Sequence, residues 1–409
     1  MKTVSRQIDT TEQLMHLAQA FHREGYTLYA VGGWVRDHLL GRTPGDLDVA
    51  SKASPDQVKA MFDLDDRVMI MPRSLPMGTL IIRVDHTMEV EYTCFRSEAY
   101  KRDGSHCPEV VTYPVSLEED ALRRDFTVNA LYYDILDSSV MDTVGGLSDL
   151  EHNRLRAVRA PREVFIEDAL RILRLCRQAA DLDAEVEADT LEGAKDMAHL
   201  MVNLSNERIG AEVHKLLMTK GNLQRGLELM ATLGTDDTLG HPLTTESILR
   251  CTKAPRHSVL RFAALLWEHN PRETMALARR LCLGAELVAD IGFILSHRSL
   301  EQEDMPWFMV QCGFKRMGML LDFHAHVLGA DVIGHRKLLA QMVAGGAVDR
   351  AEDLDIDGKA IMEALGIAPS QEIGKVKRAL LYHVAHHPED NRRDRLLTLV
   401  QNGQLPQIS

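Results

Sequence analysis

The sequence predicts an α+β fold, in which an N-terminal mixed β-sheet with helices is followed by a long all-α region. Short β-rich runs such as TLIIRVD and MEVEYTCF lie before about residue 140. After about residue 160, apolar residues recur with the spacing of amphipathic helices, as in EVFIEDALRILRLCRQAADL. Because strands come first and helices follow, the pattern indicates an α+β unit ahead of a helical region.

Local patterns justify the individual elements in order. A helix is expected over residues 11–23, followed by the β-rich runs YTLYAVGG and LDVAS. The next two β-rich runs flank Asp85 and His86, which predicts a hairpin at these residues. Helical periodicity then continues through NERIGAEVHKLLMTK and VLRFAALLWEHN. Breaks in the helical pattern are expected near residues 235–242 and 345–355.

Composition limits the class of protein. A chain of 409 residues is too long for one ordinary core, so roughly two to four domains are expected. The chain has no long apolar run and no signal-like N-terminus, and its six cysteines are scattered, so we expect reduced thiols, a cytoplasmic location and no membrane span. A formal charge of −13 argues against indiscriminate binding of polyanions, but a local basic strip leaves RNA binding open. The strip comprises Arg154, Arg156, Arg159, Arg162, Arg171, Arg174 and Arg177.

Two glycines, Gly32 and Gly33, end a predicted strand and open a predicted helix. Glycine at such a turn lets backbone amides approach a phosphate closely, and the start of the helix adds a favourable dipole. The pair is a weak signal by itself, since most such turns are structural. No P-loop sequence follows it.

Asp46 and Asp48 lie two residues apart on a predicted strand, so both carboxylates should point to the same face. Converging carboxylates are costly unless a cation neutralises them, and Mg²⁺ bridging to a nucleotide phosphate would do so. A polar strand end is the simpler alternative for an isolated D-x-D. A third carboxylate could come from the hairpin at Glu91 or Glu89, which share one face, so spacing does not choose between them.

The segment LRRDFTVNALYYD holds a second cluster of polar residues. Arg123, Arg124 and Asp125 suit a triphosphate and a ribose hydroxyl, and Asn129 could brace either group. The alternative is a capped helix start with Asp125 near its N-terminus.

The segment EDALRILR places Asp168, Arg171 and Arg174 three residues apart on one face of a predicted helix. A structural salt bridge between neighbouring turns is the simpler interpretation. An acceptor beside a donor also matches the edge of adenine or cytosine and mismatches guanine or uracil, which would leave buried polar groups unpaired.

Taken together, these motifs resemble those of class II tRNA nucleotidyltransferases (CCA-adding enzymes) and bacterial poly(A) polymerases. The segments VGGWVRD…GDLDVAS, EYTCFR, RRDFTVNA, DTVGGLSDL, EDALRILR and SNERIGAEVHKLL have the order and spacing of this family. The resemblance covers residues 25 to about 217, and the segment after residue 353 resembles the C-terminal part of many CCA-adding members.

The resemblance implies an architecture and a set of roles. A nucleotidyltransferase head over 1–140 would precede a base-selecting neck over 141–235, a body over 236–345 and an RNA-binding tail over 346–409. Mg²⁺ would be the cofactor, held by the carboxylates of the D-x-D motif. The implied catalytic residues are Asp46, Asp48 and Glu91. The implied nucleotide-binding residues are Gly32, Gly33, Arg36, Arg123, Arg124, Asp125, Asn129, Asp168, Arg171 and Arg174.

The implied reaction is the addition of C, C and A from CTP and ATP to tRNA 3′ ends, without a template. In the tail, Arg392, Arg393 and Arg395 could hold RNA phosphates, although a solvated helical face explains them equally well. An A-adding enzyme, a poly(A) polymerase and, from another class, a non-catalytic RNA-binding relative remain alternatives. The oligomeric state is open.

Two departures from the family pattern lie in the helical region. Many relatives carry a His-Asp phosphohydrolase domain in the body, but here Trp267 and Glu268 stand where His-Asp would be expected, so no phosphohydrolase activity is predicted. The base-selecting motif usually continues into Arg-Phe-Ala and here reads Arg177-Gln178-Ala179. We expect this change to affect packing more than chemistry.

Overall fold

The computed structural model describes residues 2–105, 108–240 and 242–406. The chain divides into two compact units, one up to Thr244 and one from Thr245 onward. This boundary lies just after the first predicted break in the helical pattern. The finer division into head, neck, body and tail stays a prediction.

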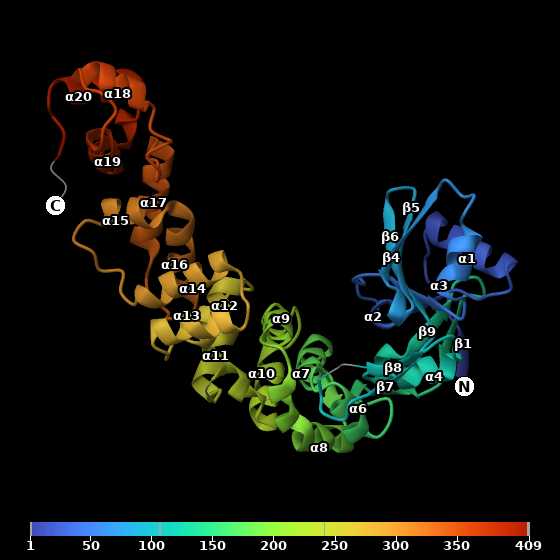
Figure 1. The fold of residues 1–409 in the computed structure, drawn as a ribbon. Helices are drawn as coiled ribbons and strands as arrows, with labels where there is room; N and C mark the ends of the chain where they lie inside the picture. The colour runs from blue at the N-terminus through green and yellow to red at the C-terminus, as the bar shows by residue number, and fades with distance from the viewer. Residues whose placement is uncertain (1, 106–107, 241, 407–409) are drawn as a thin grey trace. The chain divides into compact units, whose positions relative to one another are not determined.

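The N-terminal unit contains a mixed eight-stranded sheet, as the β-rich runs predict (Figure 1). Strands β3 and β6 are parallel and the other neighbours are antiparallel. The predicted hairpin is confirmed, since Asp85 and His86 connect β5 to β6 with positive φ angles of 50° and 57°. The strand order is β1 (Lys2–Ser5), β10 (Ser139–Asp142), β9 (Leu131–Asp134), β2 (Tyr29–Val31), β3 (Asp48–Ser51), β6 (Met88–Cys94), β5 (Thr79–Val84) and β4 (Val68–Ser74).

Helix α1 (Glu12–Arg23) covers part of this sheet and begins where the sequence predicts. The side chain of Thr11 caps it by accepting a hydrogen bond from the backbone N–H of Leu14, at 3.2 Å. Phe21 of α1 is fully buried and packs against Tyr92 of β6, with ring centroids 5.6 Å apart. This apolar contact helps to hold β6 in place at the site described below.

Along the chain, the remaining helices of this unit lie either between strands of the sheet or after the last of them. Figure 1 shows α6 to α10 grouped together after the sheet. The remaining helices of the unit are α2 (Gly33–Leu39), α3 (Pro55–Met61), α4 (Leu117–Leu122), α5 (Gly146–Glu151), α6 (Pro161–Glu167), α7 (Leu170–Leu182), α8 (Ala188–Met197), α9 (Asn206–Leu217) and α10 (Leu223–Leu233). Two short pairs, β7–β8 (Ser97–Tyr100, Pro108–Thr112) and β11–β12 (Arg154–Leu155, Glu185–Val186), complete the unit.

The second unit is helical in its described residues, as the periodicity predicts. A small core near its C-terminus joins α18, α19 and α20 through Ile361, Leu380 and Leu396, which are all fully buried. The helices are α11 (Thr245–Lys253), α12 (Ser258–Leu265), α13 (Pro271–Arg280), α14 (Ala285–Ser296), α15 (Met305–Cys312), α16 (Phe314–His326), α17 (Ile333–Gly345), α18 (Gly358–Leu365), α19 (Gln371–His386) and α20 (Arg393–Gln401).

Two further expectations concern cysteines and membranes. Cys94, Cys176, Cys251, Cys282 and Cys312 are free thiols, while Cys107 lies outside the described residues. In the described part of the chain, none of the helices combines the length and apolar character that a membrane crossing needs.

Candidate active site

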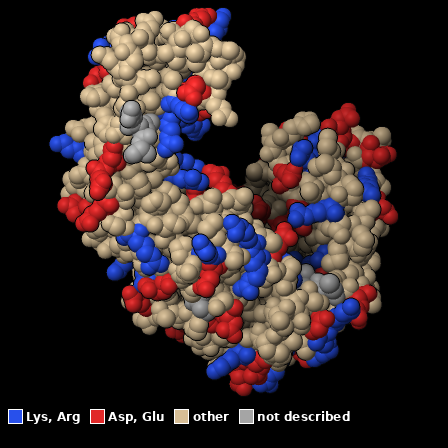
Figure 2. Space-filling view, turned by 60° about the vertical axis from the view of Figure 1, so that its left-hand side comes forward, with Lys and Arg blue, Asp and Glu red and all other residues tan. Residues whose placement is uncertain are grey.

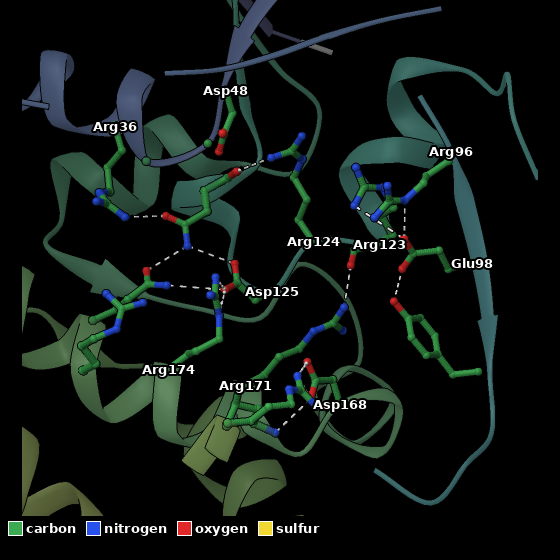
Figure 3. A pocket seen from close by; sticks show the side chains of 18 residues that line it. Arg36, Asp48, Arg96, Glu98, Arg123, Arg124, Asp125, Asp168, Arg171 and Arg174 are labelled. Carbon is green, nitrogen blue, oxygen red and sulfur yellow. Dashed lines mark hydrogen bonds and ion pairs between the residues drawn. The ribbon is translucent and has the colours of Figure 1, made fainter. Parts of the chain in front are cut away.

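Polar residues of the N-terminal unit surround a cavity of about 470 Å³ (Figure 3). Eight arginines and four carboxylates line it, so its charge suits a polyanion such as a nucleoside triphosphate. All ten residues predicted to bind the nucleotide line this cavity, although they come from distant parts of the sequence. Additional lining residues are Asp48, Arg96, Glu98, Tyr100, Leu170, Arg177, Gln178 and Arg208.

The Gly32–Gly33 turn connects β2 to α2 at one wall of the cavity, as predicted. Gly32 has a φ of +73°, and a Cβ placed on it would lie 3.5 Å from Nη1 of Arg124. The positive φ would strain any other residue at this position, whereas the Cβ itself would be in ordinary van der Waals contact with Arg124. The backbone conformation of the turn therefore favours glycine.

The D-x-D carboxylates are arranged differently from the prediction in one respect. Strand β3 begins at Asp48, whereas Asp46 lies in a bend before it, so the two residues do not share one strand. Asp48 pairs in parallel register with Glu91 of β6. Glu91 also forms an ion pair of 2.6 Å with Arg73. The register thus places Glu91 beside Asp48.

Glu89, the alternative third carboxylate, has a different environment. It pairs in register with Arg83 and forms a 2.6 Å ion pair with it. The geometry therefore favours Glu91 over Glu89 as the companion of Asp48, although the catalytic role of Glu91 stays a prediction.

The Asp48 carboxylate lies where its charged form is disfavoured. It reaches solvent, but protein atoms crowd its other sides; this desolvation, together with the negative charge of Glu91, raises its pKa to about 6. Asp46 adds to the rise and Arg124 opposes it. A divalent cation would supply the missing positive charge, so the residues present fit such an ion. Among the described residues, no group of three His, Cys, Asp or Glu side chains is arranged to hold a metal ion by itself, and phosphate oxygens and water would have to complete the coordination.

Asp120 anchors the two arginines of the RRD motif. Its buried carboxylate accepts hydrogen bonds from Nε of Arg123 (2.8 Å), Nη2 of Arg124 (3.2 Å) and the hydroxyl of Tyr132 (2.6 Å). Burial by itself would raise the pKa of Asp120, but the charges of Arg123 and Arg124 and the Tyr132 hydroxyl lower it to about 2. Asp120 was not among the predicted site residues, although its spacing of three and four residues from the arginines was a usable signal.

Replacing Asp120 by asparagine should destabilise the protein by about 2 kcal/mol at neutral pH and raise the KM for CTP. The stabilisation from a lowered pKa is present above the unfolded value near 4 and is lost as the pH falls toward 2. The difference between wild type and variant in thermal melts should therefore shrink on acidification. Asp56→Asn is the matched control, because Asp56 is 95% exposed. An Asp120→Asn variant with unchanged stability and KM would contradict the anchoring role.

Asp125 and Asn129 form the centre of a second network, of which Asp125 and Arg174 are labelled in Figure 3. Arg174 donates to Oδ2 of Asp125 from Nε (2.8 Å) and Nη2 (2.5 Å), and Nδ2 of Asn129 donates to Oδ1 of Asp125 (3.0 Å). Burial opposes the charge of Asp125, but Arg174 and Asn129 hold its pKa well below the usual range. Gln178 also bonds to Asn129, at 2.8 Å, so this side chain does more than pack.

Asp168 lies outside the helix predicted for it. It is the extended residue between α6 and α7, with φ −149° and ψ 100°, and accepts bonds of 3.0 and 3.1 Å from Nη2 of Arg208. Arg171 is on α7 and donates to the backbone carbonyls of Arg123 (2.7 Å) and Val164 (3.0 Å). Both side chains nevertheless line the cavity. Arg208 was not among the predicted site residues, because it lies 40 residues after Asp168.

A group on the opposite wall, on the right of Figure 3, was also missed. The side chain of Glu98 on β7 is 3% exposed, and its carboxylate accepts hydrogen bonds from Arg96 and from the hydroxyl of Tyr100. Arg123 approaches the same carboxylate at 3.8 Å. The shared carboxylate of Glu98 fixes Arg96 and Arg123 at the cavity wall. Nothing in the local sequence pattern predicted this role.

In the second unit, the positions compared with His-Asp take part in packing and an ion pair. Trp267 is 9% exposed, packs on Phe323 at 5.0 Å and lies under the guanidinium of Arg298 at 4.6 Å. Glu268 forms a 2.5 Å ion pair with Arg250. The absence of phosphohydrolase activity stays a prediction.

Comparisons with known proteins agree with this site. Residues 28–156 match the poly A polymerase head domain, and residues 184–236 match the domain described as the probable RNA and SrmB-binding site of polymerase A. The CCA-adding enzyme of Levilactobacillus brevis is 31% identical over 398 residues, covering 95% of this chain and 97% of that protein. That of Streptococcus gordonii is 32% identical over 403 residues, covering 93% and 94%.

Solved structures show the same fold. The crystal structure of the Bacillus stearothermophilus CCA-adding enzyme in complex with CTP has a TM-score of 0.77 at 26% identity, covering 96% of this chain and 97% of that chain. The Thermotoga maritima CCA-adding enzyme complexed with tRNA has a TM-score of 0.64 at 16% identity, covering 97% and 96%, and is similar in fold alone. With full-length relatives above 30% identity and a match to the poly A polymerase head domain, this chain belongs to the family of CCA-adding nucleotidyltransferases.

Proposed function

We propose that this protein adds C, C and A from CTP and ATP to the 3′ ends of tRNA without a template. The observation that carries the proposal is that one cavity is lined by Asp48, by eight arginines that include Arg171, and by Asp168. The full-length similarity to enzymes named for CCA addition supports it. A cytoplasmic location, where tRNA and nucleoside triphosphates are available, fits this proposal.

Four residues that line the cavity would position the nucleotide. Arg123 and Arg124 would hold the triphosphate, while Asp125 and Asn129 would bind the ribose. Mg²⁺ held by Asp46 and Asp48, with Glu91 nearby, would assist the attack of the tRNA 3′-hydroxyl on the α-phosphate and the departure of pyrophosphate. The protein itself contributes mainly position and charge, as in other phosphoryl transfers.

Base selection would lie at Asp168 and Arg171. The carboxylate can accept from the exocyclic amine of cytosine or adenine, and the guanidinium can donate to the adjacent ring nitrogen. Uracil and guanine present a carbonyl and a ring N–H in these places, so both protein groups would lose their partners.

One experiment tests the proposal against its alternatives. A tRNA that ends before CCA is incubated with CTP alone, ATP alone or both, and the 3′ ends are sequenced. CCA addition predicts CC with CTP alone and a single complete CCA with both. Addition of A alone or of long A tracts would instead identify an A-adding enzyme or a poly(A) polymerase, and no addition would favour a non-catalytic RNA-binding relative.

Three tail arginines should contribute to tRNA binding. Arg392, Arg393 and Arg395 lie at the start of α20 and are exposed. Figure 2 shows basic and acidic side chains interspersed on the face drawn, so RNA would be held by local basic groups and not by a continuous positive surface.

Replacing these three arginines together by alanine should raise the KM for tRNA several-fold and reduce its salt dependence, while leaving the KM for CTP unchanged. KM is measured for both substrates across a series of KCl concentrations. The same change at three exposed residues of the first unit, Lys2, Arg6 and Arg23, controls for net charge. An unchanged salt slope in the tail variant would mean that this face is merely solvated.

A further inference from the structure

Gln178 is a buried amide in the wall of the nucleotide cavity. It lies on α7, its side chain is 2% exposed, and it stands where the family resemblance leads one to expect phenylalanine. A buried amide needs hydrogen-bond partners, which phenylalanine does not. The identity of these partners indicates what the substitution does.

Both halves of the Gln178 amide are used. Its Oε1 accepts a hydrogen bond of 2.8 Å from Nδ2 of Asn129, and its Nε2 donates to Oδ2 of Asp125 at 3.4 Å. Asn129 and Asp125 also bond to each other at 3.0 Å. Gln178 therefore closes a three-residue ring of hydrogen bonds that joins α7 to the segment before β9.

This ring determines which way the Asn129 amide faces. Its Nδ2 donates to two acceptors, Gln178 and Asp125, while its Oδ1 accepts a 2.6 Å bond from Nη1 of Arg36. Reversing the amide would direct its N–H groups at the Arg36 guanidinium, which is also a donor, and its oxygen at two acceptors. Gln178 thus helps to hold Asn129 and Arg36 in one arrangement.

The bond from Gln178 to Asp125 is the longest in this network. Asp125 accepts much shorter bonds from Arg174, at 2.5 and 2.8 Å, and one of 2.8 Å from the backbone N–H of Phe126. A hydroxyl group that donates to Oδ2 of Asp125 would displace the weakest of these bonds, and its oxygen could then accept from Nε2 of Gln178. A ribose 2′-hydroxyl has both capacities, whereas the 2′-carbon of a deoxyribose carries no hydroxyl and offers neither.

We propose that Gln178 takes part in recognition of the ribose 2′-hydroxyl, by donating to its oxygen from Nε2 and by positioning Asn129 and Asp125. This inference rests on the proposed function, since it takes the cavity to bind a ribonucleoside triphosphate. It extends that function, because it assigns selection of the sugar to a residue on a different element from the RRD motif. Base selection at Asp168 and Arg171 is separate from it.

The test compares CTP with dCTP. In Gln178→Leu and Gln178→Phe, the preference for CTP over dCTP in kcat/KM should fall by about 3- to 10-fold, since one neutral hydrogen bond is lost. The preference for CTP over UTP should not change. Cys176→Ala is the matched control, because Cys176 is fully buried on the same helix without lining the cavity, and it should keep both preferences.

The outcomes separate this inference from the proposed function. If the wild type incorporates neither CTP nor ATP, the proposed function fails. If it does incorporate them and both Gln178 variants lose activity with CTP and dCTP in proportion, Gln178 has a structural role and the inference is overturned. Thermal melts identify any variant that does not fold, and Gln178→Phe then carries the test, since phenylalanine is the residue expected from the family.

Discussion

Replacing Asp48 by asparagine should abolish the addition of both C and A. A divalent cation at the D-x-D carboxylates would stabilise charge on the reacting oxygens by several kcal/mol, so losing it should lower kcat by at least about a hundredfold. The loss should be equal for CTP and ATP, because the carboxylates act on the phosphate and not on the base. Asp46→Asn should have the same effect. Incorporation is measured with a tRNA primer at saturating Mg²⁺.

Stability measurements show whether such a loss reflects catalysis. The pKa of Asp48 is raised to about 6, so the folded protein disfavours its charged form at neutral pH. Replacing the carboxylate by a neutral amide should therefore not lower the melting temperature when Mg²⁺ is absent. Glu89→Gln is the matched control, since Glu89 lies on the same face of β6 as Glu91 but pairs with Arg83. Near wild-type incorporation in Asp48→Asn, or an equal loss in Glu89→Gln, would contradict the assignment.

The sequence predicted which motifs belong to the site but not how the chain holds them. Glycines at a turn and the β-hairpin depend on local backbone preferences, and both were correctly placed. The choice between Glu89 and Glu91 required the parallel register of β3 with β6. That register is set by pairing between distant segments, so no local pattern contains it.

Some partners were missed for a related reason. Arg208 and Glu98 contact site residues that are distant in sequence, and nothing in their local sequence pattern marks them. Asp168 was assigned to a helix because its spacing from Arg171 fits one, yet the helical conformation is interrupted at this residue, between α6 and α7. The backbone of Asp168 is extended there, and Arg208 can reach its carboxylate. Helical spacing alone could not reveal this break.

Replacing Arg171 by alanine should weaken base selection more than it weakens triphosphate binding. Two backbone carbonyls, from Arg123 and Val164, hold the guanidinium in place on the cavity wall. Loss of a hydrogen bond from a charged donor costs about 1.5–3 kcal/mol. Discrimination of CTP and ATP against UTP and GTP should therefore fall by about one to two orders of magnitude. Asp168→Ala should reduce discrimination similarly and also impair the correct reaction, since the amine loses its acceptor.

The decisive measurement is kcat/KM for all four ribonucleotides. Arg171 also bonds to two carbonyls, so its loss should lower stability as well, and an absolute decrease in rate is not informative by itself. The ratio between nucleotides is informative, because a purely structural arginine would lower all four values in proportion. Arg162→Ala is the matched control: this arginine on α6 forms an ion pair with Asp196 but does not line the cavity. It should leave the four ratios unchanged, and a proportional decrease in Arg171→Ala would show that Arg171 supports the cavity wall without reading the base.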